Sequence, residues 1–157
     1  MKIKTLEEEI AEHPFFEGLS AQTCALIASC GRNVRFDTNE TIYKLGTPAD
    51  TFYVIRQGSV ALEMPVAGKP MMFETVDGDN ILNAGWLVAP YTCHSDARAL
   101  NPTRAIAFDA VCLRGKCDDD PAVGYALMKR FVPIVLERLN HARLQAMDVY
   151  DGGNISG

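Results

Sequence analysis

Positive charge is in short supply in this sequence. Lysine and arginine together number 15, against 20 aspartate and glutamate residues, which gives a net charge of −5 at pH 7. A protein that binds nucleic acid by itself usually presents a basic face. We therefore expect no direct DNA binding.

Long apolar runs are also missing. No stretch approaches the roughly 20 residues that are needed to span a bilayer. The N-terminal segment carries the three consecutive glutamates Glu7 to Glu9, where a signal peptide would have an apolar stretch. These absences predict a cytoplasmic protein with no membrane segment.

Cysteines are few and unevenly spaced, and they are odd in number: Cys24, Cys30, Cys93, Cys112 and Cys117. A reducing cytoplasm would keep them as thiols, so we expect buried thiols and no disulfide framework. Zinc needs four ligands at paired spacings, and no second close pair accompanies Cys112 and Cys117. We therefore predict no metal site.

Histidines are equally sparse, since His13, His94 and His141 stand far apart. Metal-dependent β-roll enzymes of the cupin type need clustered histidines. The sequence also contains no nucleophile-elbow, His-Glu-x-x-His or phosphate-loop pattern. We therefore predict that the protein is not an enzyme, and we expect His13 and His141 to be solvated.

Helical patterns lie at both ends of the chain. Residues 1–31 contain short amphipathic stretches, with Ser20 as a helix N-cap and Gly31 as a stop. Residues 120–150 follow a longer helical pattern that starts at an Asp-Pro pair, with Pro133 as a kink or break.

The middle of the chain, residues 32–109, alternates short β-branched and aromatic runs with turn signals such as Gln57-Gly58 and Asn101-Pro102. Such spacing is typical of an antiparallel sandwich or barrel. We therefore expect residues 1–157 to form one mainly β domain. Its fold would be an antiparallel β-roll (a double-stranded β-helix or jelly roll) with N-terminal helices and a long C-terminal helix.

One face of the long helix has the spacing of a coiled-coil seam. Its members are 4, 3, 4 and 3 residues apart: Val135, Leu139, Ala142, Ala146 and Val149. Such a seam needs an apolar partner. A second copy of the chain would make a homodimer, and the alternative is that the seam lies on the β-roll of its own subunit.

The adjoining arc of the same helix holds Leu136, Arg143, Met147 and Tyr150 at ~100° per residue. Arg143 is the misfit among these apolar neighbours. Either it extends along them to water, or it points into a cavity and offers its guanidinium to an anion.

The centre of the β region reads GTPADTFYVIRQGSV over residues 46–60 and resembles the cyclic nucleotide-binding domain, in particular the effector half of the CRP/FNR transcription regulators. The family carries a glycine, an acidic residue, an aromatic and aliphatic strand, and a Gly-x-Val turn. These places are held here by Gly46, Asp50, Tyr53 to Ile55, and Gly58 with Val60. The resemblance covers residues 10–150, and we expect no helix-turn-helix.

The resemblance implies a phosphate-binding cassette that ends near Ala97-Arg98-Ala99. In the family, a glutamate there accepts from a ribose hydroxyl and an arginine pairs with the cyclic phosphate. Asn83 stands here in place of the glutamate and Cys93 in place of the arginine. Losing one partner of a buried charge pair costs about 3–5 kcal/mol. We therefore expect no cyclic AMP binding in the usual mode, unless Arg98 or Arg143 supplies the charge.

The predicted ligand pocket surrounds this cassette and consists of Asn83, Ala84, Gly85, Trp86, Leu87, Cys93, His94 and Arg143. Trp86 is the single tryptophan, and it either stacks on a planar ligand or plugs an empty cavity. Haem is an alternative ligand, because haem-containing members of the superfamily ligate iron from this region and Cys93 and His94 are of suitable types.

These observations predict a non-enzymatic small-ligand sensor or regulatory module with a degenerate cassette. Its ligand, whether a cyclic nucleotide, haem or another small molecule, stays open. Binding would shift the long helix and so act on a homodimer or on a partner protein. The alternatives are a ligand-free dimerisation or docking module, and a haem-based gas or redox sensor.

Overall fold

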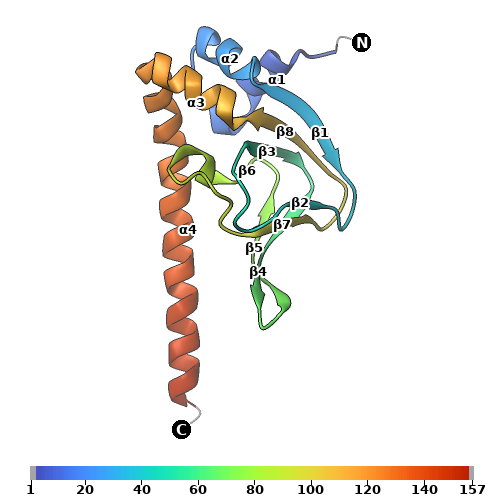
Figure 1. Cartoon of the computed structure of the whole chain (residues 1–157), viewed down its shortest axis with the longest axis vertical. Coiled ribbons are helices and arrows are strands. Elements are labelled where there is room, and N and C mark those ends of the chain that lie inside the picture. The colour runs from blue at the N-terminus through green and yellow to red at the C-terminus, as the bar shows by residue number, and fades with distance from the viewer. Residues whose placement is uncertain (1–2, 156–157) are drawn as a thin grey trace.

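The computed structural model describes residues 3–155 and shows a β-roll with helices before and after it (Figure 1). The helices are α1 (Leu6–Glu12), the 3-10 helix η1 (Pro14–Phe16), α2 (Ala21–Ala28), the 3-10 helix η2 (Ala84–Leu87), α3 (Ala110–Asp119) and α4 (Pro121–Ile155). The strands are β1 (Gly31–Phe36), β2 (Thr41–Tyr43), β3 (Thr51–Gln57), β4 (Ser59–Val66), β5 (Lys69–Asp77), β6 (Ile81–Leu82), β7 (Asp96–Ala99) and β8 (Thr103–Asp109). The expected mainly β class is confirmed.

The strands form two four-stranded antiparallel sheets, ordered β1-β8-β3-β6 and β2-β7-β4-β5. Strand β3 shows how the sheets divide the core, because its side chains alternate between two faces. Phe52 and Val54 pack on the helical side, whereas Ile55 packs inside the roll with β4 residues such as Val60 and Leu62. The roll is therefore apolar on both faces of its central strand.

Turn glycines have the conformations that the sequence predicts. Gly46 and Gly58 have positive φ angles of 82° and 110°. At Gly58 a Cβ atom would also lie 2.7 Å from the Cα of Thr103. Only glycine therefore fits this turn between β3 and β4.

The N-terminal helices begin at the caps that the sequence marks. The side chain of Ser20 accepts a hydrogen bond from the amide of Thr23, and Thr5 forms a capping box with Glu8. The expected helix stop at Gly31 is wrong, because α2 ends at Ala28 and Gly31 is already the first residue of β1.

The C-terminal helices begin earlier than expected. The boundary predicted at residue 120 overlooked α3, which follows β8 directly and is capped by the carboxylate of Asp109, an acceptor for the amide of Cys112. Helix α4 begins at Pro121 as predicted, and it continues through Pro133 to Ile155 without a break. The long helix therefore reaches the roll through a second helix and not through a loop.

One expectation about the cysteines is also wrong. Cys30 and Cys112 are joined in a disulfide, with their Cα atoms 6.1 Å apart. The register of β1 with β8, in which Gly31 pairs with Phe108, brings these distant residues together. Cys24 and Cys93 are buried free thiols, and Cys117 is half-buried. None of the helices within residues 3–155 is both long enough and apolar enough to cross a bilayer.

His13 is buried rather than solvated, whereas His141 is exposed. Nδ1 of His13 accepts a hydrogen bond from the amide of Phe15 at 3.1 Å, and Nε2 of His13 lies 3.3 Å from the carbonyl oxygen of Ile55. This pattern fits the neutral ring with a proton on Nε2. Burial lowers the pKa of His13 below its usual 6.5, against smaller opposing effects of the Ile55 carbonyl and Asp79.

This lowered pKa predicts a pH-dependent stability. Above pH 6.5 the ring is neutral in both states and its contribution is complete. As the pH falls below that value the unfolded chain takes up the proton first, so the free energy of unfolding decreases until the folded pKa is reached. Urea unfolding between about pH 5 and 8 measures this slope.

His13→Asn keeps a capping acceptor for the Phe15 amide and removes the titrating group, so we expect it to flatten that part of the pH profile. His141→Asn is the matched control on an exposed histidine, and it should leave the profile as it is. An unchanged slope in His13→Asn would contradict this assignment.

Candidate functional site

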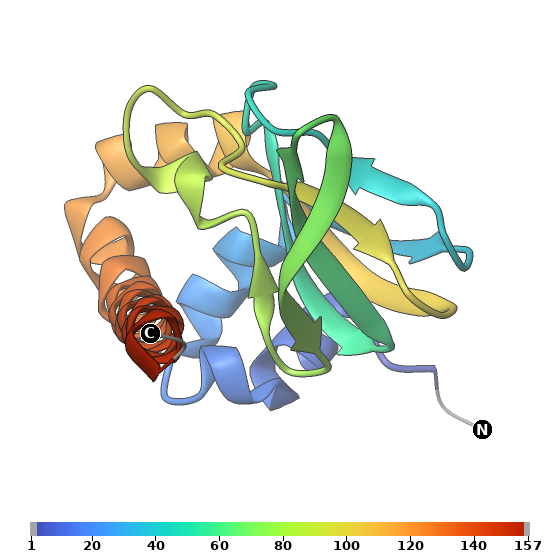
Figure 2. The same cartoon turned by 90° about the horizontal axis from the view of Figure 1, so that it is seen from below.

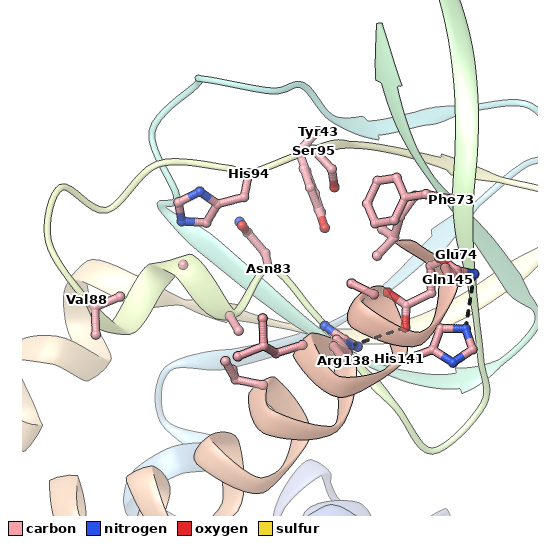
Figure 3. Close-up of a pocket in the computed structure, with 16 residues that line it drawn as sticks. Tyr43, Phe73, Glu74, Asn83, Val88, His94, Ser95, Arg138, His141 and Gln145 are labelled. Carbon is pink, nitrogen blue, oxygen red and sulfur yellow. Dashed lines mark hydrogen bonds and ion pairs between the residues drawn. The ribbon is translucent and has the colours of Figure 1, made fainter. Parts of the chain in front are cut away.

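A cavity of about 370 Å³ lies between the roll and α4 (Figure 3). Figure 2 looks along α4 and shows that the helix lies beside the sheets and not within them. The roll contributes Tyr43, Leu62, Phe73, Glu74, Asn83, Ala84, Gly85, Val88, His94 and Ser95. Helix α4 contributes Val135, Arg138, Leu139, His141, Ala142 and Gln145. We call this space the α4 cavity.

Four polar side chains gather at the roll end of the α4 cavity, namely Tyr43, Asn83, His94 and Ser95 (Figure 3). Burial raises the pKa of Tyr43, so its hydroxyl stays protonated throughout the physiological range. The Asn83 amide nitrogen donates to the carbonyl oxygen of Thr51 at 2.8 Å. This end of the cavity therefore offers several hydrogen-bond donors and acceptors and no carboxylate or guanidinium group.

The backbone at Asn83 and Gly85 places η2 close to the loop that precedes β7. Asn83 has a left-handed conformation, with a φ of 74°, and precedes η2. A Cβ atom at Gly85 would lie 2.5 Å from the carbonyl oxygen of Thr92 and 2.9 Å from the His94 ring. Glycine at this position is what lets the loop before β7 bring His94 against η2.

Helix α4 presents three apolar side chains to the cavity, Val135, Leu139 and Ala142, beside the polar Arg138, His141 and Gln145. Val135 and Leu139 are 46% and 45% exposed, which shows that the cavity is open along α4. The part of the predicted coiled-coil seam that they form therefore faces the protein's own roll.

Arg138 ties α4 to the roll. Its Nη2 donates to the carbonyl oxygen of Ile81 at 2.6 Å, and its Nε lies 3.7 Å from Oε1 of Glu74. Both charged side chains are largely buried, so this pair is screened less than a surface pair. Nothing in the local sequence marks Arg138 beyond its place on the long helix.

The structure brings half of the predicted pocket residues to the α4 cavity: Asn83, Ala84, Gly85 and His94. The prediction missed the aromatic and hydroxyl groups Tyr43, Phe73 and Ser95. Ser95 adjoins a predicted residue, but Tyr43 and Phe73 come from strands whose pairing the sequence alone could not place.

Trp86 does not line the α4 cavity. Its side chain is 0% exposed and belongs to the core on the helical side of the roll. It stacks on Phe52, with ring centroids 4.4 Å apart and planes 12° apart, and meets Phe131 of α4 edge-on. The burial of Trp86 favours the interpretation in which its ring fills the core over the one in which it stacks on a ligand.

Arg114 of α3 contacts the segment around Trp86. Nη1 of Arg114 donates to the Trp86 carbonyl oxygen at 2.6 Å. The same guanidinium lies 4.3 Å from the centre of the Tyr91 ring, in a cation–π contact. This link between α3 and the cassette escaped the sequence analysis because α3 itself was not predicted.

Cys93 and Leu87 also lie away from the α4 cavity. Leu87 is half-buried against the main core. The Cys93 thiol is 2% exposed and accepts a hydrogen bond from the Thr47 hydroxyl at 3.5 Å. The residue that the resemblance sets in place of the family's arginine is therefore a buried thiol that faces the turn between β2 and β3.

Neither candidate replacement for that arginine lines the α4 cavity. Arg98 forms a two-pronged ion pair with Glu63, at 3.0 and 3.2 Å, and donates to Asn39 at 2.9 Å. Arg143 is exposed, on the arc of α4 that turns away from the cavity. The extension of Arg143 to water is therefore the interpretation that fits. Tyr150 has no described side chain.

Haem ligation by Cys93 and His94 together does not fit this geometry. His94 lines the α4 cavity, whereas Cys93 lines a separate hollow beside β2 and β3. Neighbouring side chains on an extended segment point to opposite sides. The two residues therefore do not present ligands to one iron.

An antiparallel roll with a cassette that faces a long helix defines a regulatory ligand-binding domain, and the comparisons agree. Residues 33–120, more than half of the chain, match the family model of the cyclic nucleotide-binding domain. The chain belongs to this family, whose domains are regulatory modules and generally not enzymes.

Solved structures show the same fold. A protein of Geobacter metallireducens named as cyclic nucleotide-binding is 26% identical, with 87% of this chain and 99% of that chain covered and a TM-score of 0.78. A cyclic nucleotide-binding domain from Methylobacillus flagellatus is 14% identical, with 91% and 81% covered and a TM-score of 0.75. The N-terminal domain of a Streptomyces coelicolor transcriptional regulator is 24% identical, with 88% and 94% covered and a TM-score of 0.65. No curated protein matches the sequence.

Proposed function

We propose that this domain is a non-enzymatic sensor that binds a small ligand in the α4 cavity and transmits its presence through α4. The observation that carries the proposal is the composition of the cavity wall. Cassette residues such as Asn83 and His94 face α4 residues such as Leu139 and Ala142 across one space. A ligand there contacts both parts, so it can favour one position of α4 over another.

The ligand does not bind as cyclic AMP binds in the family's usual mode. That mode needs a guanidinium for the phosphate and a carboxylate for the ribose. The corresponding places hold the buried thiol of Cys93 and the amide of Asn83. An amide can still meet a hydroxyl group, but a buried thiol cannot balance the charge of a phosphate.

A second copy of the chain is the proposed partner of α4. Since Val135, Leu139 and Ala142 line the cavity, the dimer contact would be made by the adjoining arc of α4 and not by the seam that the sequence predicts. Leu136 and Met147 on that arc are 58% and 62% exposed. An apolar helix face of this kind is stabilised by a matching face. Ligand binding in the cavity and dimerisation would then use neighbouring faces of one helix.

The test combines thermal unfolding with amide hydrogen exchange on the purified full chain. Cyclic AMP, cyclic GMP, cyclic dinucleotides and a set of uncharged small molecules are screened at millimolar concentration. A ligand at about 100 times its Kd stabilises by about 2.7 kcal/mol, or several degrees. We expect a hit to slow exchange over residues 135–145 as well.

Stabilisation with no change of exchange in α4 would contradict the sensor. A complete absence of hits, with an intact dimer, would favour the ligand-free docking module.

A further inference from the structure

We infer that the ligand of the α4 cavity is uncharged: a mostly apolar molecule with a few hydroxyl, carbonyl or ring-nitrogen groups at one end. This inference rests on the proposed function only in taking the α4 cavity as the ligand site. The charges, the polar groups and the apolar wall of the cavity each point to it.

The described lining of the cavity has no unpaired lysine or arginine. Among the described lining residues there is one carboxylate, that of Glu74, and one guanidinium, that of Arg138, and these lie 3.7 Å apart. The Arg138 guanidinium also donates to the Ile81 carbonyl oxygen. To pair with Arg138, an anionic ligand would have to displace the Glu74 carboxylate. The charge of Arg138 is therefore already balanced within the protein.

The side chains of Arg98 and Arg114 are bound to other partners. Arg98 is held by Glu63 and Asn39, and Arg114 is held by the Trp86 carbonyl oxygen and the Tyr91 ring. Neither lines the α4 cavity, and neither does Arg143. Burying an anion without a paired cation is costly. Among the described residues that line the α4 cavity, therefore, no lysine or arginine is free to pair with a ligand anion.

The groups that do face the ligand suit a neutral molecule. The Tyr43 and Ser95 hydroxyls, the Asn83 amide and the His94 ring can each donate or accept a hydrogen bond at the roll end. Leu62, Phe73 and the α4 wall form the remaining apolar lining. A mainly apolar cavity with a few convergent polar groups is the usual form of a small-molecule site.

A matched pair of fluorescent probes tests this inference on the full chain. N-phenyl-1-naphthylamine is uncharged, and 8-anilinonaphthalene-1-sulfonate has the same rings with one added sulfonate. We expect the uncharged probe to bind about tenfold tighter or more, since an unpaired charge costs at least the corresponding 1.4 kcal/mol. Cyclic AMP should not displace it.

Two variants locate the probe. Ala142→Trp fills the cavity from α4 and should abolish binding of the uncharged probe. Ala146→Trp, one turn further along, places the same ring on a residue that does not line the cavity and should bind as the natural chain does. Equal binding to both variants would place the probe elsewhere and overturn the inference.

A third variant tests the role of the ion pair. Glu74→Gln keeps the shape of the side chain and releases Arg138 from its carboxylate. We expect the affinity for the sulfonate probe to rise about tenfold relative to that for the uncharged probe. Tighter binding of the sulfonate or of cyclic AMP to the natural chain would overturn the inference. If the uncharged probe binds in the cavity and exchange in α4 does not change, the ligand class stands and the sensor proposal fails.

Discussion

Trp86→Ala is expected to lower the free energy of unfolding by about 3–5 kcal/mol, the usual cost of truncating a buried tryptophan. The ring is fully buried between Phe52 and Phe131, so its loss opens a cavity between the roll and α4. Because Trp86 is the single tryptophan, unfolding is best followed by circular dichroism. Binding of the uncharged probe should be retained under conditions in which the variant stays folded.

Trp86→Phe is the matched control. The indole Nε1 is buried and has no hydrogen-bond partner among the described residues, so phenylalanine removes an unsatisfied donor as well as volume. We expect a cost under about 1.5 kcal/mol, as for other conservative core changes. Should Trp86→Ala instead keep near-natural stability and lose probe binding, the ring would belong to the ligand site and not to the core.

The second large effect is expected at the surface of α4. The double variant Leu136→Glu and Met147→Glu should convert a homodimer into monomers. Burying each of these side chains is worth about 1.5–3 kcal/mol, and both copies lose them. Dimer dissociation should therefore increase at least about a thousandfold, which corresponds to 4.1 kcal/mol. Sedimentation velocity over a concentration series measures this change.

Val135→Glu is the control on the neighbouring arc. It places the same charge in the wall of the α4 cavity and should leave the dimer intact while weakening the uncharged probe. If Val135→Glu dissociates the dimer and the double variant does not, the seam is the one first predicted from the sequence. A natural chain that is monomeric at every concentration would refute the proposed dimer.

The sequence was informative wherever a local rule decides the structure. Turn glycines such as Gly46 and Gly58, the Ser20 cap and the Asp-Pro start of α4 depend on the few residues around them. The strand runs between them identified the roll. Helix α3 was missed because its residues carry little apolar periodicity and include Gly115. Its position is fixed by contacts with distant residues.

The candidate site was predicted only in part because it depends on long-range packing. Spacing showed that α4 has two apolar arcs, but it could not show which arc faces the roll. That choice depends on contacts made by Phe131 and Arg138, one with the core and one with β5 and β6. In the same way, nothing near Cys30 in the sequence indicates that Cys112 lies beside it.

The bond between Cys30 and Cys112 also determines how the domain carries mechanical load. It closes a covalent ring that spans 82 positions of the sequence and contains the entire β-roll. Tension applied to the two ends of the oxidised chain passes from α2 through the sulfur atoms directly into α3 and α4. The strands then lie outside the line of force, so stretching draws out the terminal helices, including the α4 wall of the cavity, and leaves the strands shielded until the bond is reduced.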